Sequence, residues 1–245
     1  MRALEPAALL WAWEQGQEQD PAVRALALLA AASPEAAWEE LGALPLGERD
    51  GRLLALREAT LGCRLEGLAR CPGCGERVDV PLDTRELRAG VEAAPAAPLQ
   101  LTLDGLELRF RLPNSLDLMA AGRCAGVDEA RRLLAERCLV EARRNASPVG
   151  AGELAEEEVT ALAEGLAAAD PGAELLLDLC CPACGHGWRE RLDVASFFWA
   201  ELEIHTPRLL REVHALARAY GWREADVLSL SPRRRRLYLE MVGGA

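Results

Sequence analysis

Lysine is absent from this chain of 245 residues, and histidine, tyrosine and phenylalanine each occur three times or fewer. Every permanently cationic side chain is therefore an arginine, which together with abundant alanine, leucine and glycine is typical of a high-GC bacterial coding sequence. The net charge is −11. This charge argues against a general nucleic-acid binder or a binder of anionic membranes, because contact with phosphates needs a basic surface.

Apolar runs long enough to span a membrane are also missing. The chain begins with Met1-Arg2-Ala3-Leu4-Glu5-Pro6, which has an early acidic residue and no small-residue cleavage site behind a clean apolar core. We therefore expect no signal peptide. The expected location is the bacterial cytoplasm, a reducing compartment in which paired cysteines favour metal over disulfides.

Motifs of common catalytic sites are lacking as well. The sequence contains no phosphate-binding glycine loop, no Gly-x-Ser-x-Gly and no dinucleotide fingerprint. Its histidines, His186, His205 and His214, do not have the spacing of paired metal ligands on a helix. We therefore predict that the protein is not an enzyme.

Two Cys-Pro-x-Cys-Gly turns are the strongest signal that the sequence does contain. Cys71 and Cys74 belong to the first turn, and Cys181 and Cys184 belong to the second. Each turn aims two thiolates at one point, so the two turns supply the four soft ligands of a closed tetrahedral zinc site. Such a site has no open position for a reacting water. We predict one structural zinc ion that joins two distant parts of the chain.

Other cysteines and one histidine adjoin or surround this site. His186 follows the second turn and is an alternative fourth ligand in a Cys3His site, although all four turn cysteines are present. Cys180 precedes Cys181 directly, and the register of the motif makes it the last residue of the incoming strand. The remaining cysteines are expected to be small buried hydrophobes, and they are Cys63, Cys124 and Cys138.

Hydrophobic and turn patterns predict an α+β fold that is mainly helical. The expected helices cover 22–32, 35–41, 48–61, 115–121, 128–143 and 153–168. Short strands are expected on both sides of each cysteine turn. Asp104-Gly105 predicts a type I′ hairpin in a separate, inserted subdomain. Two hairpins tipped by cysteine turns that face each other form a zinc ribbon, which is here split by this hairpin-plus-helices insert.

Five segments follow from this interpretation. They are an N-terminal helical region (1–62), the first half of the zinc ribbon (63–90), an inserted β-hairpin and helical subdomain (91–172) that begins with a linker at 91–98, the second half of the ribbon (173–193) and a C-terminal helical arm (194–245). Trp11, Trp13 and Trp38 are expected in the core of the N-terminal region. In the arm, Thr206-Pro207 predicts a restart or a kink.

The order of these segments, together with several short motifs, resembles a known family. The motifs are Arg109-Phe110-Arg111-Leu112-Pro113-Asn114-Ser115, Phe198-Trp199-Ala200-Glu201, Tyr220-Gly221-Trp222 and Leu230-Ser231 with Arg234-Arg235. The chain resembles the T4-like baseplate protein family of contractile phage tails, whose relatives also accompany extracellular contractile injection systems. The resemblance covers nearly the whole chain, and its motifs are most specific in the C-terminal third.

The resemblance implies a non-enzymatic baseplate or hub component, or a chaperone-like factor that helps the hub to assemble. Hub, spike or tail-tube proteins are the implied partners. The zinc ion is not implied by the family, since many phage relatives lack the cysteines. As a hypothesis, the arm presents a partner-binding surface with Trp222 and Tyr238 as rigid aromatic contacts. The basic side chains expected on this surface are Arg233, Arg234 and Arg235.

Two rival interpretations stay open. A zinc-ribbon nucleic-acid-binding regulator would combine the ribbon with a weak helix-turn-helix pattern at 217–231. A metalloenzyme would instead place His186 or Glu201 beside the metal.

Overall fold

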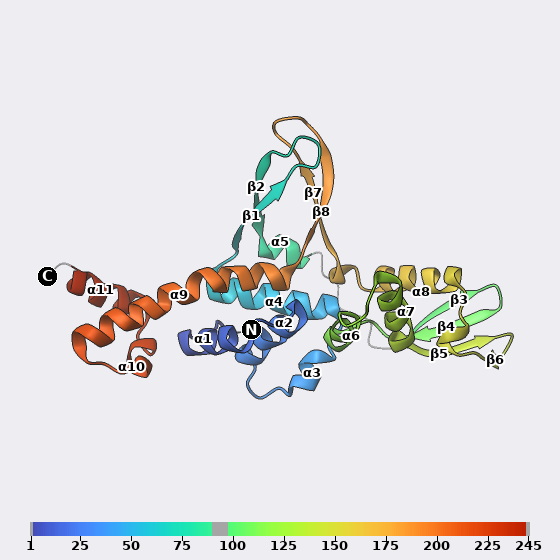
Figure 1. Ribbon diagram of the computed structural model, residues 1–245, viewed down its shortest axis with the longest axis horizontal. Coiled ribbons are helices and arrows are strands. Elements are labelled where there is room, and N and C mark those ends of the chain that lie inside the picture. The colour runs from blue at the N-terminus through green and yellow to red at the C-terminus, as the bar shows by residue number, and fades with distance from the viewer. Residues whose placement is uncertain (1, 90–97, 244–245) are drawn as a thin grey trace.

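The computed structural model describes residues 2–89 and 98–243, so nearly all of the linker expected at 91–98 lies outside the described residues. Within them the chain is mainly helical, with small antiparallel sheets. The molecule is elongated. Its C-terminal helix α11 (Pro232–Gly243) lies at one end, a small sheet lies at the other, and two hairpins project from the middle (Figure 1).

The helical body is formed by the N-terminal helices together with the first half of a long helix from the other end of the chain. These helices are α1 (Pro6–Gln15), α2 (Pro21–Ala32), α3 (Trp38–Gly42), α4 (Leu46–Leu61) and α9 (Val194–Tyr220). Asp20 caps α2, because its carboxylate accepts hydrogen bonds from the backbone N–H groups of Ala22 and Val23. The core between the helices includes Leu26, Phe198 and Trp199, all of which are fully buried.

The tryptophan prediction for this body is wrong for Trp11, which is 43% exposed. The buried face of α1 is formed by Leu9, Leu10 and Ala12, so a side chain at position 11 points away from the core. Trp13 and Trp38 are partly buried and pack against the cluster. The helix expected over 35–41 begins later, at the start of α3.

The two cysteine turns join the strands of two separate antiparallel hairpins. The first hairpin pairs β1 (Arg64–Arg70) with β2 (Arg77–Asp83), and the second pairs β7 (Leu175–Cys180) with β8 (Gly187–Leu192). A short helix that the sequence analysis did not predict, α5 (Thr84–Ala89), follows the first hairpin. The hairpins arise from different parts of the helical body, and their tips approach each other (Figure 1).

The inserted region contains a four-stranded sheet instead of a lone hairpin. Its strand order is β3 (Leu99–Leu103), β4 (Leu106–Phe110), β5 (Leu139–Arg144) and β6 (Ser147–Pro148). The helix predicted over 128–143 is wrong over 139–143, since α7 (Val127–Cys138) ends where β5 begins. Pairing with β4 places Ala142 opposite Leu108 and buries both, which a continued helix would not do.

Two further helices complete the insert, and a buried carboxylate on the first of them bonds to α7 and to the segment that follows β4. They are α6 (Ser115–Ala121) and α8 (Glu156–Ala169), and two short 3-10 turns lie at Ala151–Glu153 and Pro171–Ala173. Asp117 accepts hydrogen bonds from the guanidinium groups of Arg111 and Arg137 and from the backbone N–H of Asn114. Burial alone would raise the pKa of Asp117, but these hydrogen bonds hold it below its ordinary value of 3.8.

The second half of α9 leads into the C-terminal arm. Of the restart or kink expected at Thr206-Pro207, the restart does not occur, since α9 continues through Pro207. Gly221 ends the helix at a φ of +68°. The short helix α10 (Glu224–Leu228) then leads to α11. Among the described residues, no helix is both long enough and apolar enough to cross a membrane.

Candidate metal centre

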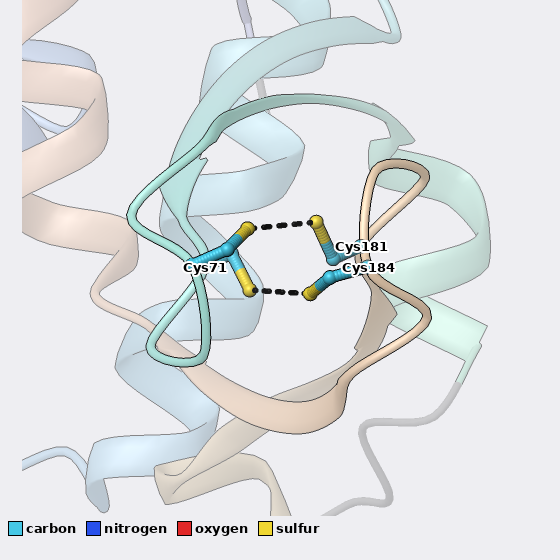
Figure 2. A group of neighbouring side chains, drawn as sticks. Cys71, Cys181 and Cys184 are labelled. Carbon is cyan, nitrogen blue, oxygen red and sulfur yellow. Dashed lines mark hydrogen bonds between the residues drawn. The ribbon is translucent and has the colours of Figure 1, made fainter.

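The four turn cysteines meet at the tips of the two hairpins. Cys71 and Cys74 come from the turn between β1 and β2, and Cys181 and Cys184 come from the turn between β7 and β8. All four sulfurs lie within 4.8 Å of one another. Figure 2 shows the sulfurs of one turn facing those of the other, with Cys71, Cys181 and Cys184 labelled. The structure therefore brings together all four predicted ligands.

Local hydrogen bonds shape both turns in the same way. In the first turn the N–H of Cys71 donates to the carbonyl of Glu76, and the N–H of Gly75 donates back to the carbonyl of Cys71. The second turn repeats this pattern, from Cys181 to His186 and from Gly185 to Cys181.

Each turn also needs the glycine that follows its second cysteine. Gly75 has a φ of +78° and Gly185 a φ of +72°, and a residue with a side chain adopts this left-handed conformation only with strain. The short Cys-Pro-x-Cys-Gly sequence is thus sufficient to direct two thiols to the same side of the turn.

The spacing of the sulfurs is compatible with zinc. A tetrahedral zinc ion with Zn–S bonds of about 2.3 Å separates neighbouring sulfurs by about 3.8 Å. Across the hairpins, the sulfur of Cys71 lies 3.7 Å from that of Cys184, and the sulfur of Cys74 lies 3.6 Å from that of Cys181. Four thiols and no hard oxygen ligands favour zinc over calcium or magnesium. The cluster could therefore hold a metal ion.

The acidity of the thiols differs between the two cysteines of the first turn. Burial opposes ionisation of Cys71, but N–H groups of Cys74 and Gly73 outweigh it and lower the pKa of Cys71 to about 7. At Cys74 the N–H of Glu76 acts in the same direction, but contact with Cys184 and burial raise the pKa of Cys74 to about 12. Without a cation, one thiolate therefore suppresses ionisation of its neighbours, whereas a divalent metal would favour all four thiolates.

An apolar layer beneath the sulfurs separates them from the helical body. Cys71 and Cys181 are buried in one cluster with Val78 and Val80. Partly buried side chains from both hairpins pack against it, among them Leu82, Leu177, Leu179 and Trp188. Val80, Leu82, Leu177 and Leu179 also line a cavity of about 520 Å³ that lies between the hairpins and the start of α9, so this apolar layer is open on its far side.

Neither of the two adjoining residues belongs to the four-cysteine group. The exposed thiol of Cys180 faces the carbonyl of Gly185, with a sulfur–oxygen distance of 3.8 Å. His186 lies against Gly73 of the opposite turn, where an added Cβ would be 3.1 Å from Cγ of the imidazole. Its ring stacks near Trp188, at 6.4 Å between centroids. His186 therefore helps the two turns to pack against each other.

Glu201, the other residue considered for a metalloenzyme, is engaged elsewhere. Its two carboxylate oxygens accept hydrogen bonds from the guanidinium of Arg57 at 2.6 and 3.0 Å. Arg57 also donates to the carbonyl of Gly62, at the end of α4. This pair joins α4 to α9 across 144 residues of sequence, and no local pattern in the sequence reveals it.

The predicted partner-binding residues of the arm lie far from the cysteines, near the end of the molecule (Figure 1). Trp222 stacks on Tyr220 at 4.7 Å and meets Tyr238 edge-on at 4.9 Å, so the aromatic side chains form one cluster in which Trp222 and Tyr238 are half-buried and Tyr220 is exposed. Arg233 and Arg234 are exposed.

Arg235 differs from its neighbours, because it is only 7% exposed. Its guanidinium donates to a carboxylate oxygen of Glu212 at 2.7 Å and to the carbonyl of Leu230. It therefore fastens α11 to α9, and the expectation that it faces a partner is corrected by this internal ion pair.

The fold and the cysteine cluster define a mainly helical protein with small antiparallel hairpins and a candidate metal centre. The chain matches the family described as T4 bacteriophage base plate protein over residues 8–199. Because this match covers most of the chain, the protein belongs to that family. The match ends before the Tyr220-Gly221-Trp222 motif. Comparison with curated proteins and with solved structures found no match.

Family membership supports a structural or assembly role in a phage baseplate and association with other baseplate or tail proteins. It also suggests a non-enzymatic role.

Proposed function

We propose that the protein is a non-enzymatic hub or assembly component of a contractile phage tail or a related injection particle. In this proposal one structural zinc ion closes a split zinc ribbon, and the C-terminal arm binds a hub, spike or tail-tube protein. The observation that carries the proposal is the convergence of four cysteine sulfurs within 4.8 Å in a member of a baseplate family. Assembly takes place in the bacterial cytoplasm.

The zinc ion has an architectural role in this proposal. Four thiolates fill a tetrahedral shell, so the ion has no open position for a substrate. Structural zinc contributes roughly 10–16 kcal/mol in small zinc peptides, which exceeds the net stability of many domains. The ion therefore acts as a clasp between two hairpins that have no covalent connection near their tips.

Unbalanced charge on the arm supports a protein-docking role. The arm (194–245) has eight arginines against six acidic residues, whereas residues 1–193 have twenty arginines against 33 acidic residues. Within the part of the chain that the structure describes, Arg235 alone among the eight arm arginines forms an ion pair. Exposed arginines without a partner, on an otherwise acidic protein, favour an acidic protein surface as the ligand.

The zinc clasp is tested by elemental analysis of the purified protein. We expect about one zinc per chain and its loss from a Cys74→Ser variant. Cys180→Ser is the matched control, because Cys180 is an exposed cysteine next to the second turn but outside the four-cysteine group. Equal zinc in both variants, or no zinc in the wild type, would contradict the proposal.

The docking role is tested by capture of purified hub, spike and tube proteins. Wild-type protein should retain one of them, and a chain truncated after Gly221 should retain less. Undiminished capture by the truncated chain would refute the arm as the docking element. Salt-sensitive retention of DNA by the wild type would instead support the nucleic-acid-binding interpretation.

A further inference from the structure

The outer face of α11 carries an apolar stripe that no other part of the described chain covers. Leu237 is 47% exposed and Met241, one helical turn further on, is 63% exposed. The opposite face packs Tyr238, Leu239 and Val242 against the core of the arm. α11 also has four arginines and one glutamate. It is therefore a basic helix with a second, unpartnered apolar face.

A groove of matching character lies between α7 and α8. Its volume is about 380 Å³, and its lining is almost entirely apolar, including Val127, Leu134, Leu162 and Leu166. Val127 is 83% exposed where the groove meets solvent. The two helices carry seven carboxylates against three guanidinium groups. Among the lining side chains only Arg131 is charged, and it pairs with Glu156, so the charge that complements α11 is the acidic excess of the two helices as a whole, beside an apolar floor.

The two features lie at opposite ends of the elongated molecule, so α11 cannot reach the groove of its own chain (Figure 1). We infer that α11 of one copy docks into the α7–α8 groove of a second copy, with Leu237 and Met241 on the apolar floor. This inference rests on the proposed docking role of the arm and names a second copy as the occupant that fits its outer face.

Such a contact is head-to-tail, because it joins different surfaces of the two copies. Repetition of the contact gives a closed ring when the rotation between copies closes, and an open chain when it does not. The net charge of −11 makes whole copies repel each other, so the apolar contact and the local charge complementarity must outweigh that repulsion.

Sedimentation of the full-length protein over a range of concentrations tests the inference. We expect the wild type to self-associate. Met241→Glu and Val127→Glu should each weaken association about tenfold or more, because each places a carboxylate in the apolar contact. Val127 begins α7, where an acidic residue is favourable, and Met241 is exposed, so both variants should fold. Leu68→Glu, at an exposed apolar position on β1, is the matched control and should associate as the wild type does.

Mixing the two variants gives the most specific outcome. Met241→Glu keeps an intact groove and Val127→Glu keeps an intact α11, so an equimolar mixture should form a dimer but no larger species. A wild type that stays monomeric, a variant that associates alone as well as the wild type, or a mixture that stays monomeric would overturn the inference.

The capture experiment with a hub protein distinguishes a failure of the self-association inference from a failure of the proposed docking role. Capture by a monomeric wild type leaves the docking role in place and removes only the second copy as occupant. If the wild type neither self-associates nor captures a hub protein, both the inference and the proposed docking role are refuted.

Discussion

Removal of the proposed zinc ion should release the two cysteine hairpins while the helical body stays folded. Each hairpin has only two strands, and such hairpins are marginally stable by themselves. The cluster between them has few fully buried side chains, and two of these are the metal-binding candidates Cys71 and Cys181. The helical body has its own larger core, centred on residues such as Leu26 and Trp199. The clasp therefore governs a local opening of the structure.

The expected magnitude follows from the length of chain that the clasp closes. Because the helical body and the insert stay folded, the clasp closes only the strands that lead to the tips, 64–71 and 175–181, and a cross-link across a loop of about 15 residues restricts the opened chain by about 3 kcal/mol. At 1.4 kcal/mol for each tenfold change, loss of the clasp should accelerate amide hydrogen exchange in the hairpins by about 10²-fold.

Hydrogen exchange measured by mass spectrometry tests this expectation directly. Zinc-loaded wild type is compared with chelated wild type and with Cys74→Ser, and Cys180→Ser is again the control. Faster exchange should be confined to 64–83 and 175–192. The reasoning would be refuted if α2 and α4 lost protection to the same extent, or if chelation left exchange in the hairpins unchanged.

Three further outcomes are expected. Asp117→Ala should lower the free energy of unfolding, measured in urea, by about 3 kcal/mol. This value is at the low end for a broken buried ion pair, because Arg111 and Arg137 can turn to solvent. Glu141→Ala, which breaks a surface ion pair, should cost less than about 1 kcal/mol. Because the pKa of Asp117 is lowered in the folded state, its contribution to the free energy of unfolding is complete above about pH 4 and is lost as the pH falls through the lowered pKa. The difference in unfolding free energy between the wild type and Asp117→Asn should therefore shrink as the pH falls below about 4. A difference that stays constant with pH would contradict this. Gly75→Ala should weaken zinc binding in competition with a chromophoric chelator, since φ at this position is +78°, and an unchanged affinity would show that the turn tolerates the side chain.

Features that depend on a few neighbouring residues could be predicted from the sequence. The cysteine turns are an example, because proline, glycine and the spacing of the thiols fix their conformation locally. The hairpin at Asp104-Gly105 is another: both residues have positive φ, and β3 and β4 pair directly on either side of them. The matching Cys-Pro-x-Cys-Gly turns likewise indicated which four cysteines would lie together.

Features that depend on distant partners could not be predicted in the same way. Residues 139–144 continue the helical pattern of α7, but the free edge of β4 recruits them as a strand. A weak signal was present in Val140, because a β-branched residue favours a strand. The ion pairs of Arg57 with Glu201 and of Arg235 with Glu212 join segments whose proximity only the folded chain creates.

The proposed zinc clasp and the C-terminal arm are structurally independent parts of the molecule. β8 leads directly into α9, so the second hairpin and the arm share one continuous stretch of chain. The first half of α9 is fixed by Phe198 and Trp199 in the core and by the Arg57–Glu201 pair, none of which involves the metal. Because α9 then continues as a single helix to Tyr220, its direction, and with it the position of the arm, is determined by the helical body. Loss of zinc should therefore impair contacts made by the hairpin tips and leave contacts made by the arm intact.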